Sequence, residues 1–429
     1  MYQQPPAPLD SVPPARRWRW PRVSANVWAI GGTSLLTDIS SEMVTSVLPL
    51  YVVLHLQMTP LAFGALDGLY QGVAAAVRLG SGVVADRFRH HKAVALAGYA
   101  LSAVAKAGYV AAGTMWPAFL AVVTADRLGK GIRTAPRDAL IAASARPGGT
   151  ATAFGVHRAM DAAGATVGPL TAFGVLMLAP GRFDQVFVVS CAMAVVGVAV
   201  LWLFVEAPGG SGRAAGVTAG ARPWARTLEA LLAPRFRAVV IAAGAVSIAS
   251  VTDGLLYLVL QRQFAFDPAR ITLLFVGTPL CYFLLAGPCG VIADRLGTAR
   301  LFVAGHLSLL AVYGLLWFGV TTAAGVAACL LCLGAYYAAT DGILAAMAAT
   351  ALPTDNRATG LGLLATCTTA GRGLAAIVFG ALWTYASTGT ALATFAALLA
   401  AGIGVSAWQL RATRPQAPPA EVAPAEVAP

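Results

Sequence analysis

The sequence predicts an all-α membrane protein with twelve transmembrane helices, arranged as two pseudo-symmetric six-helix bundles. Of its 429 residues, 58% are hydrophobic and only 11% are charged, which leaves too little polar surface for a soluble globular protein. The apolar residues fall into runs of about twenty or more, the length that a helix needs to cross a hydrocarbon core of about 30 Å. The runs show no ten-residue alternation, so they predict helices and not a β-barrel.

Breaks at proline, glycine and charged clusters divide the chain into twelve apolar runs. Six lie in the first half, at residues 25–54, 61–85, 93–112, 117–143, 151–178 and 185–205. Six lie in the second half, at residues 238–261, 271–293, 301–320, 324–349, 358–383 and 391–410. An even number of crossings places both termini on the same side of the membrane.

The segments outside these runs cannot bury a core. Residues between the halves are rich in Gly, Ala and Arg without apolar periodicity, and the last residues repeat Pro, Ala, Glu and Val. We therefore expect a disordered cytoplasmic N-terminus at 1–24, an N-terminal six-helix bundle at 25–205, a cytoplasmic linker at 206–236, a C-terminal six-helix bundle at 237–410 and a disordered cytoplasmic tail at 411–429.

The basic residues are distributed unevenly between the two sets of loops. Most of them fall in the termini, the linker and the loops on the same side, whereas the opposite loops offer only Arg182, Arg262 and Arg270. The positive-inside rule then predicts a multi-pass protein of the plasma (inner) membrane with both termini in the cytoplasm. This placement explains the net charge of +11 without a nucleic-acid partner. The first twenty residues are Pro-rich and basic, so we expect no cleavable signal peptide.

The two halves share short sequence patterns. The second run ends in GVVADR at residues 82–87, and the eighth run ends in GVIADR at residues 290–295. Weaker matches pair Thr37-Asp38 with Thr252-Asp253 and the Gly164 region with the Gly371 region. These matches predict an internal duplication, and a site between two equivalent halves can open to either side when one half rocks against the other.

The repeated turn places an acid and a base at the end of a helix. An acid just inside the membrane boundary can pair with a base or with a helix N-terminus across the interface between the halves. We interpret the two turns as conformational latches, and the alternative is a simple positive-inside anchor. The latch residues are Gly82, Asp86, Arg87, Gly290, Asp294 and Arg295.

These turns resemble the signature of the major facilitator superfamily (MFS), which lies between the second and third helices. That signature is Gly, two variable residues, a small residue, Asp-Arg, then Gly and basic residues. The first copy has Arg89 where the family usually has Gly, whereas the second copy has Gly297 there. The resemblance covers essentially all twelve spans and implies the MFS fold.

The fourth run contains the stretch ADRLGKGIRTAPRDAL. Its Arg127 lies about ten residues into the run, hence about 15 Å deep. An Arg followed four residues later by Gly, here Gly131, resembles the family's fourth-helix motif, which is associated with proton coupling. Asp126, Lys130 and Arg133 follow steps of three and four residues, so they form a polar stripe that must face a partner helix or a cavity.

The fifth run carries a spaced set of small residues. They are Gly155, Gly164, Gly168 and Pro169. The set resembles the antiporter signature of drug-exporting members of the family, although Ala172 and Phe173 stand where two further glycines are usual. Close helix packing alone is the alternative reason for these glycines.

Ionisable residues inside the spans are the main candidates for function, because each costs at least about 2.5 kcal/mol at the bilayer centre unless it is paired or hydrated. The candidates for proton coupling or the substrate cavity are Asp38, Glu42, Arg127, Lys130, Arg158, Asp161, Asp253 and Asp341. A carboxylate that alternates between a paired ionised state and an unpaired protonated state can carry a proton, so we select Asp38, Glu42 and Asp161 as carriers. Structural ion pairing is the competing interpretation. We place Asp67 near the outer interface.

The sequence argues against metal, cofactor and enzyme chemistry. All six cysteines lie in apolar runs, and the C-x-x-C pair Cys329 and Cys332 has no accompanying His or second pair. No soluble catalytic domain and no phosphate-binding glycine loop is visible. We therefore expect no cofactor, no metal and no enzyme, and no ATP-driven pump in this chain alone.

Together these patterns predict a secondary active transporter for a small organic solute, acting as a monomer in the lipid bilayer by alternating access. The chain resembles prokaryotic proton-coupled permeases of the drug-efflux type, which implies export in exchange for protons. The mixed charges of the spans leave the substrate anionic, zwitterionic or cationic. The alternatives are a proton-coupled importer of an anionic solute and a non-transporting membrane sensor or scaffold with a transporter fold.

Overall fold

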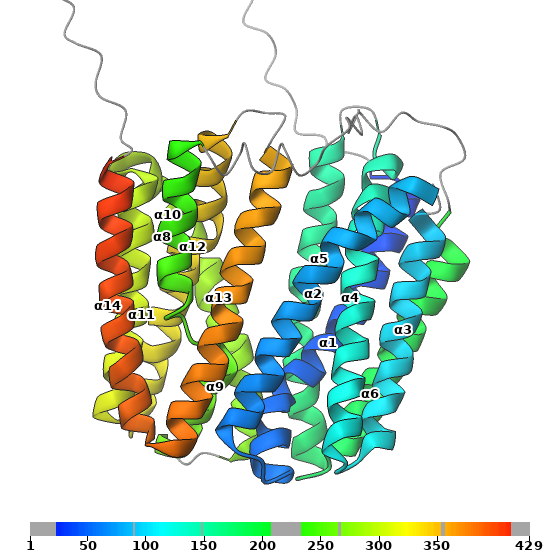
Figure 1. The fold of residues 1–429 in the computed structure, drawn as a ribbon. Coiled ribbons are helices and arrows are strands. Elements are labelled where there is room, and N and C mark those ends of the chain that lie inside the picture. The colour runs from blue at the N-terminus through cyan, green and yellow to red at the C-terminus, as the bar shows by residue number, and fades with distance from the viewer. Residues whose placement is uncertain are drawn as a thin grey trace, which may run out of the picture.

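The computed structural model describes residues 23–88, 91–146, 149–206, 233–264, 267–352 and 357–412. All regular secondary structure within these ranges is helical, as Figure 1 shows. The predicted N-terminus, the central part of the linker and the C-terminal tail lie outside the described residues, so the domain boundaries drawn through them stay predictions.

Twelve crossings account for the described helices. The first half contains α1 (Ala25–Leu50) with the π-helical extension η1 (Tyr51–His55), α2 (Pro60–Phe88), α3 (His91–Ala112), α4 (Trp116–Ser144), α5 (Thr150–Leu178) and α6 (Phe183–Phe204). The second half contains α8 (Pro234–Ser247), α9 (Asp253–Phe264), the 3₁₀ helix η2 (Pro268–Leu273), α10 (Leu274–Leu296), α11 (Thr298–Phe318), α12 (Ala323–Ala351), α13 (Arg357–Tyr385) and α14 (Thr388–Ala412). The twelve-helix prediction is confirmed, with boundaries that differ from the apolar runs by a few residues.

Local sequence signals set several helix ends. The Ser24 hydroxyl accepts a hydrogen bond from the Val27 amide (3.3 Å) at the start of α1, and Thr322 caps α12 through the Gly325 amide (3.1 Å). Gly297 separates α10 from α11 with a φ of +90°, a conformation that a residue with a side chain rarely adopts. The glycine of the second repeated turn therefore makes the tight connection between two crossings.

The seventh crossing is broken, although the sequence showed a continuous apolar run there. Helix α8 ends at Ser247 and α9 begins at Asp253. Between them the Tyr313 hydroxyl donates to the Ala249 carbonyl (2.7 Å) and accepts from the Val251 amide (2.8 Å). Unwound backbone is tolerated within a span where side chains satisfy its polar groups. The hydrogen bonds that stabilise the break thus come from α11, which is distant in sequence.

The surface of the helices matches a lipid environment. Eight of the described helices, α3, α5, α6 and α10–α14, are long and apolar enough to cross a membrane by length and composition. Large apolar side chains stand outward on them, and Trp202, Phe204, Phe283 and Phe318 are between 64% and 83% exposed. Of the remaining crossings, α1 and α4 contribute the largest groups of buried polar and charged residues to the interior.

Helices α2 and α13 join the two halves at one end of the molecule. A Cβ added to Gly64 would overlap the Ala376 carbonyl, and one added to Gly68 would lie 2.8 Å from the Gly373 carbonyl. Near the same end the Leu61 amide donates to Thr384 Oγ1 (3.0 Å). Figure 1 shows the halves close together at this end and separated at the opposite end, where α6 stops and α8 starts. A cavity lies next to this contact, between the two halves.

Candidate functional site

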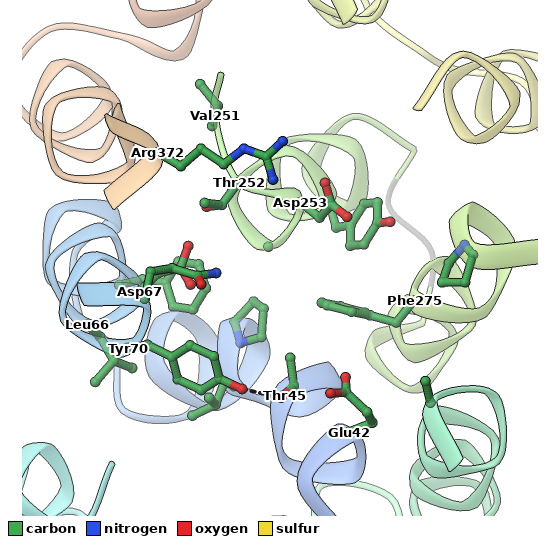
Figure 2. A pocket seen from close by; sticks show the side chains of 18 of the residues that line it. Glu42, Thr45, Leu66, Asp67, Tyr70, Val251, Thr252, Asp253, Phe275 and Arg372 are labelled. Carbon is green, nitrogen blue, oxygen red and sulfur yellow. Dashed lines mark hydrogen bonds between the residues drawn. The ribbon is translucent and has the colours of Figure 1, made fainter. Parts of the chain in front are cut away.

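A cavity of about 260 Å³ lies between the two halves, and Figure 2 shows the side chains that line it. Helices α1, α2 and α5 line it from the first half. The broken segment with α9, α10, α12 and α13 lines it from the second half. Its charged residues are Glu42, Asp67, Asp253 and Arg372, and its aromatic residues are Phe63, Tyr70, Tyr257, Phe275, Tyr336 and Tyr337.

The first-half wall is fixed by hydrogen bonding and stacking. Thr45 Oγ1 and Tyr70 Oη are hydrogen-bonded at 2.8 Å, one helical turn after Glu42 on α1 (Figure 2). Behind the wall the guanidinium of Arg127 stacks on the Tyr70 ring at 3.8 Å from its centroid. Helix α4 therefore positions Tyr70 from the side away from the cavity.

The second-half wall combines tyrosines with charged groups. The Tyr337 hydroxyl donates to Asp253 Oδ1 (2.8 Å), and Asp253 is also the first residue of α9, where the helix dipole favours an acid. Arg372 donates from Nη2 to the Tyr336 hydroxyl (2.9 Å) and lies 3.8 Å from Asp341 Oδ1. These contacts hold a carboxylate and a guanidinium at the cavity surface.

Asp67 and Thr252 bring unsatisfied oxygens to the cavity. Among the described residues, neither Asp67 Oδ2 nor Thr252 Oγ1 forms a well-aligned hydrogen bond, although both atoms are buried and the Thr252 hydroxyl lies close enough to act on the Asp67 carboxylate. A buried polar atom without a partner is costly, so these oxygens are available to a ligand. The sequence-based placement of Asp67 near the outer interface is wrong. Asp67 lies seven residues after the start of α2, about 10 Å along the helix, and this depth was the sequence signal that could have placed it inside the span.

A compact ion cluster lies inside the first half, behind the Tyr70 wall. Asp126 accepts from Lys106 Nζ (2.9 Å) and from Arg127 Nη2 (2.7 Å), and all three side chains are at most 2% exposed. The Tyr109 hydroxyl approaches the same carboxylate at 3.5 Å. Arg127 therefore supports the cavity from behind and is not among its lining residues, and its role in proton coupling stays a prediction.

A second polar cluster connects α1, α4 and α5. Arg133 Nη2 lies 3.7 Å from Asp38 Oδ1 and stacks on Tyr99, while Asp161 lies beside Asp38. His157 Nε2 lies 3.3 Å from Asp161 Oδ2, but the two groups are not aligned for a hydrogen bond. This cluster contains two of the three predicted proton carriers.

Comparisons with known proteins decide the family. The family model described as Major Facilitator Superfamily matches residues 30–260 and 248–429. The chain belongs to the major facilitator superfamily. It is similar to an MFS-type transporter from Methanocaldococcus jannaschii, with 25% identity over 370 residues, 84% of this chain and 89% of the relative. It is also similar to a protein from Mycobacterium tuberculosis strain H37Rv, with 30% identity over 307 residues, 70% of this chain and 71% of the relative.

Solved structures show the same fold at low sequence identity. The nucleoside transporter NupG superposes with a TM-score of 0.71 and 14% identity, covering 91% of this chain and 99% of that chain. The POT-family transporter PepTSo superposes with a TM-score of 0.73 and 12% identity, over 91% and 99% of the two chains. At this identity the likeness establishes the MFS fold and leaves the solute open.

The remaining candidates of this MFS protein fall at different distances from the cavity. Glu42 and Asp253 line it, whereas Asp341 lines an adjoining cavity of about 210 Å³ inside the second half, which shares Tyr336 and Arg372. Lys130 exerts its charge on Glu42 and Asp38 from α4. Arg158 is exposed and lines neither cavity, and its role in proton coupling stays a prediction.

The proposed latches are only partly described. The surroundings of Gly82 and the side chains of Asp86 and Arg87 lie outside the described part of the chain. Asp294 and Arg295 are exposed at the end of α10, and neither forms an ion pair with another described residue. A Cβ added to Gly290 would meet no atom within 4 Å, so no helix packs closely there.

The glycines of α5 differ in their surroundings. A Cβ on Gly164 would lie 2.8 Å from the Leu35 carbonyl oxygen, and one on Gly168 would lie 2.7 Å from that of Ile39. Both glycines thus let α5 approach α1, and Pro169 follows them in the buried part of α5. Gly155 has no such neighbour within 4 Å, so the predicted packing role does not apply to it here.

Proposed function

We propose that this MFS protein is a secondary active transporter that exports a small organic solute through the central cavity in exchange for protons. The observation that carries the proposal is the cavity itself, which lies between the halves and is lined by both. A site shared by two related bundles can face either side of the membrane when one bundle rocks against the other. The protein acts on its solute by binding and movement, without catalysis.

The arrangement of the halves supports an inward-facing state. Their contact through α2 and α13 lies at the end away from the α6 and α8 termini at the linker, and the halves separate toward those termini (Figure 1). With both termini in the cytoplasm of a plasma-membrane monomer, the cavity opens inward. The exposed Asp294 and Arg295 are then a disengaged latch, which pairs when the halves close on the cytoplasmic side.

Proton coupling is assigned to the acids of α1 and α5. Asp38 and Asp161 lie side by side, and repulsion between two ionised carboxylates is relieved when one takes up a proton. Arg133 Nη2 lies 3.7 Å from Asp38 Oδ1, so a cation of α4 stands beside this pair of acids. Glu42 lies one turn further along α1 and lines the cavity, so it connects the proton pair to the solute.

An importer of an anionic solute is the second candidate. Arg372 favours it, because its guanidinium lines the cavity and could bind a carboxylate. A sensor or scaffold is a third, and it predicts no flux of any solute. Flux measurements separate all three.

The decisive experiment is transport in proteoliposomes with an imposed pH gradient, using a panel of cationic, neutral and anionic solutes. We expect counterflow of a solute and protons, which a pH dye trapped in the lumen reports. Asp38→Asn should abolish gradient-driven flux while leaving solute exchange at equal pH, because the proton carrier is lost but the cavity is retained.

Asp184→Asn is the matched control, since the ion pair of Asp184 among the described residues is with exposed Arg182 at the start of α6. It should transport like the unaltered protein. Gradient-driven flux that survives Asp38→Asn removes Asp38 from the mechanism, and co-directional movement of an anion with protons establishes the importer instead.

A further inference from the structure

We propose that the central cavity binds a small organic amine in its protonated form, with the ammonium between Asp67 and Asp253 and the organic body against the aromatic wall. This inference rests on the proposed function, because it names the chemical class of solute for the same cavity. The argument comes from the charge, the unsatisfied oxygens and the shape of the cavity.

The charged lining has a surplus of negative charge. Three carboxylates face one guanidinium, that of Arg372, which already contacts Tyr336 at 2.9 Å and Asp341 at 3.8 Å. An anionic solute would have to compete for this guanidinium and would enter a field of carboxylates. A cation balances the same field, and in a site shielded from water this balance is worth more than at a surface.

The surplus is concentrated at the end of the cavity that holds Asp67 and Asp253. Glu42 experiences three positive charges from inside the first half, those of Lys130, Arg127 and Lys106, against one negative charge, that of Asp38. The charged group acting on Asp67 is Asp253, another acid, whereas Arg372 and Asp341 act on Asp253 with opposite signs. The preferred place for a positive group is therefore between Asp67 and Asp253, not at Glu42.

Hydroxyl groups are the main hydrogen-bond donors at the same end, and they leave acceptor capacity unused. Asp67 Oδ2 and Thr252 Oγ1 are buried without a well-aligned hydrogen bond among the described residues, although the Thr252 hydroxyl lies close enough to act on the Asp67 carboxylate. Asp253 accepts from Tyr337 through Oδ1, and the Tyr257 hydroxyl also acts on it. Figure 2 shows Asp67 and Asp253 entering the cavity from opposite halves, with Thr252 nearby. An ammonium group offers up to three N–H donors and can satisfy oxygens from both halves at once, which a hydroxyl or a carboxylate cannot.

The other walls suit an apolar or aromatic body. Tyr257 and Phe275 pack edge to face with their ring centroids 4.8 Å apart. The ring centroids of Tyr336 and Tyr337 lie 4.9 Å apart. Aromatic faces attract cations as well as apolar groups. The volume of about 260 Å³ is below the range of about 300–1,000 Å³ that is usual for drug-sized ligands, so we assign a small amine and not a bulky polycyclic cation.

The test uses three probes that share one body and differ in the head group: 2-phenylethylamine, 3-phenylpropanoate and 2-phenylethanol. Their binding to the purified full-length protein is measured by calorimetry in a sodium-free buffer. We expect the amine to bind at least tenfold more tightly than the acid and the alcohol. Asp67→Asn and Asp253→Asn should each weaken amine binding at least tenfold, whereas Asp184→Asn should leave it unchanged.

A second variant separates charge loss from misfolding. Asp67→Glu keeps the carboxylate and should retain amine binding within about threefold, while Asp67→Asn loses it in protein that remains monodisperse. The preference for the amine in the unaltered protein tests the proposal without any variant.

Two results overturn the proposal. The first is that the amine binds no more tightly than its acid and alcohol analogues. The second is that sodium chloride fully displaces the amine, whereas choline chloride at the same ionic strength does not. Transport is tested separately in proteoliposomes. Amine binding without flux of any solute supports the cavity chemistry and contradicts the transport function, whereas flux of the acid alone supports transport and contradicts the amine.

Discussion

Two charge clusters of this protein differ in how they satisfy their charges. Inside the first half, Asp126 contacts Lys106 and Arg127 at 2.7–2.9 Å, and all three are at most 2% exposed. In the second half, beside the cavities, Arg372 of α13 and Asp341 of α12 lie 3.8 Å apart and are 31% and 51% exposed. The first cluster is enclosed by one half, although Asp126 Oδ1 and Arg127 Nε have no hydrogen-bond partner among the described residues. The second cluster is looser and faces a cavity. The difference indicates that the enclosed charges are paired more tightly than the charges that face a cavity.

The largest expected effect is on the enclosed cluster. Asp126→Asn leaves two buried cations without their common partner, and breaking a buried ion pair costs about 3–5 kcal/mol. We expect a marked fall in the thermal stability of the purified protein, read by tryptophan fluorescence. Asp341→Asn removes a half-exposed acid and should cost much less. Equal losses for the two variants would erase the distinction between the clusters.

The next effect concerns the boundary where the halves must separate and close. Gly68→Leu places a side chain against the Gly373 carbonyl, so α2 cannot approach α13 and closure at that end fails. We expect solute flux to fall at least tenfold with little loss of stability. Gly72→Leu is the matched control one turn away on the same helix, because a Cβ there meets no atom within 4 Å. Normal flux with Gly68→Leu would mean that this contact need not form.

The smallest effect compares two tyrosine hydrogen bonds across the cavity. Tyr337→Phe removes a donor to the Asp253 carboxylate, and Tyr70→Phe removes a partner of the neutral Thr45 hydroxyl. Hydrogen bonds to charged groups contribute about 1.5–3 kcal/mol and neutral ones about 0.5–1.5 kcal/mol. Tyr337→Phe should therefore lower thermal stability more than Tyr70→Phe. The reverse order would place the more important hydrogen bond in the first-half wall.

The sequence indicated how deep the candidate residues lie within their spans, but not the direction in which their side chains point. Glu42 and Asp253 were selected as charged residues within spans, and both line the cavity. Arg127 was selected for the same reason, but it points away and stacks behind Tyr70. Depth follows from position along a helix, whereas the direction of a side chain depends on how the helix is rotated against its neighbours.

Asp67 shows the opposite error. Its place near the start of a span suggested the outer interface, yet it lines the cavity, because the α2–α13 contact through Gly64 and Gly68 closes the end beyond it. The aromatic lining was also missed, since Tyr336 and Tyr337 belong to an apolar run that gives no sign of which face meets the cavity. The first finding depends on contacts between residues about 300 positions apart in the chain, and the second on contacts of Tyr336 and Tyr337 with other helices of the second half.

By itself, the sequence determined the membrane environment, the twelve crossings, the duplication and the family, because run length, hydrophobicity and short motifs are local properties of the chain. Only the tertiary structure decided where the seventh crossing breaks, since Tyr313 of α11 satisfies the unwound backbone. It also decided which charges are enclosed by one bundle and which face the cavity. Burial and pairing are properties of the assembled helices, and each charge takes its role from the partners that packing brings to it.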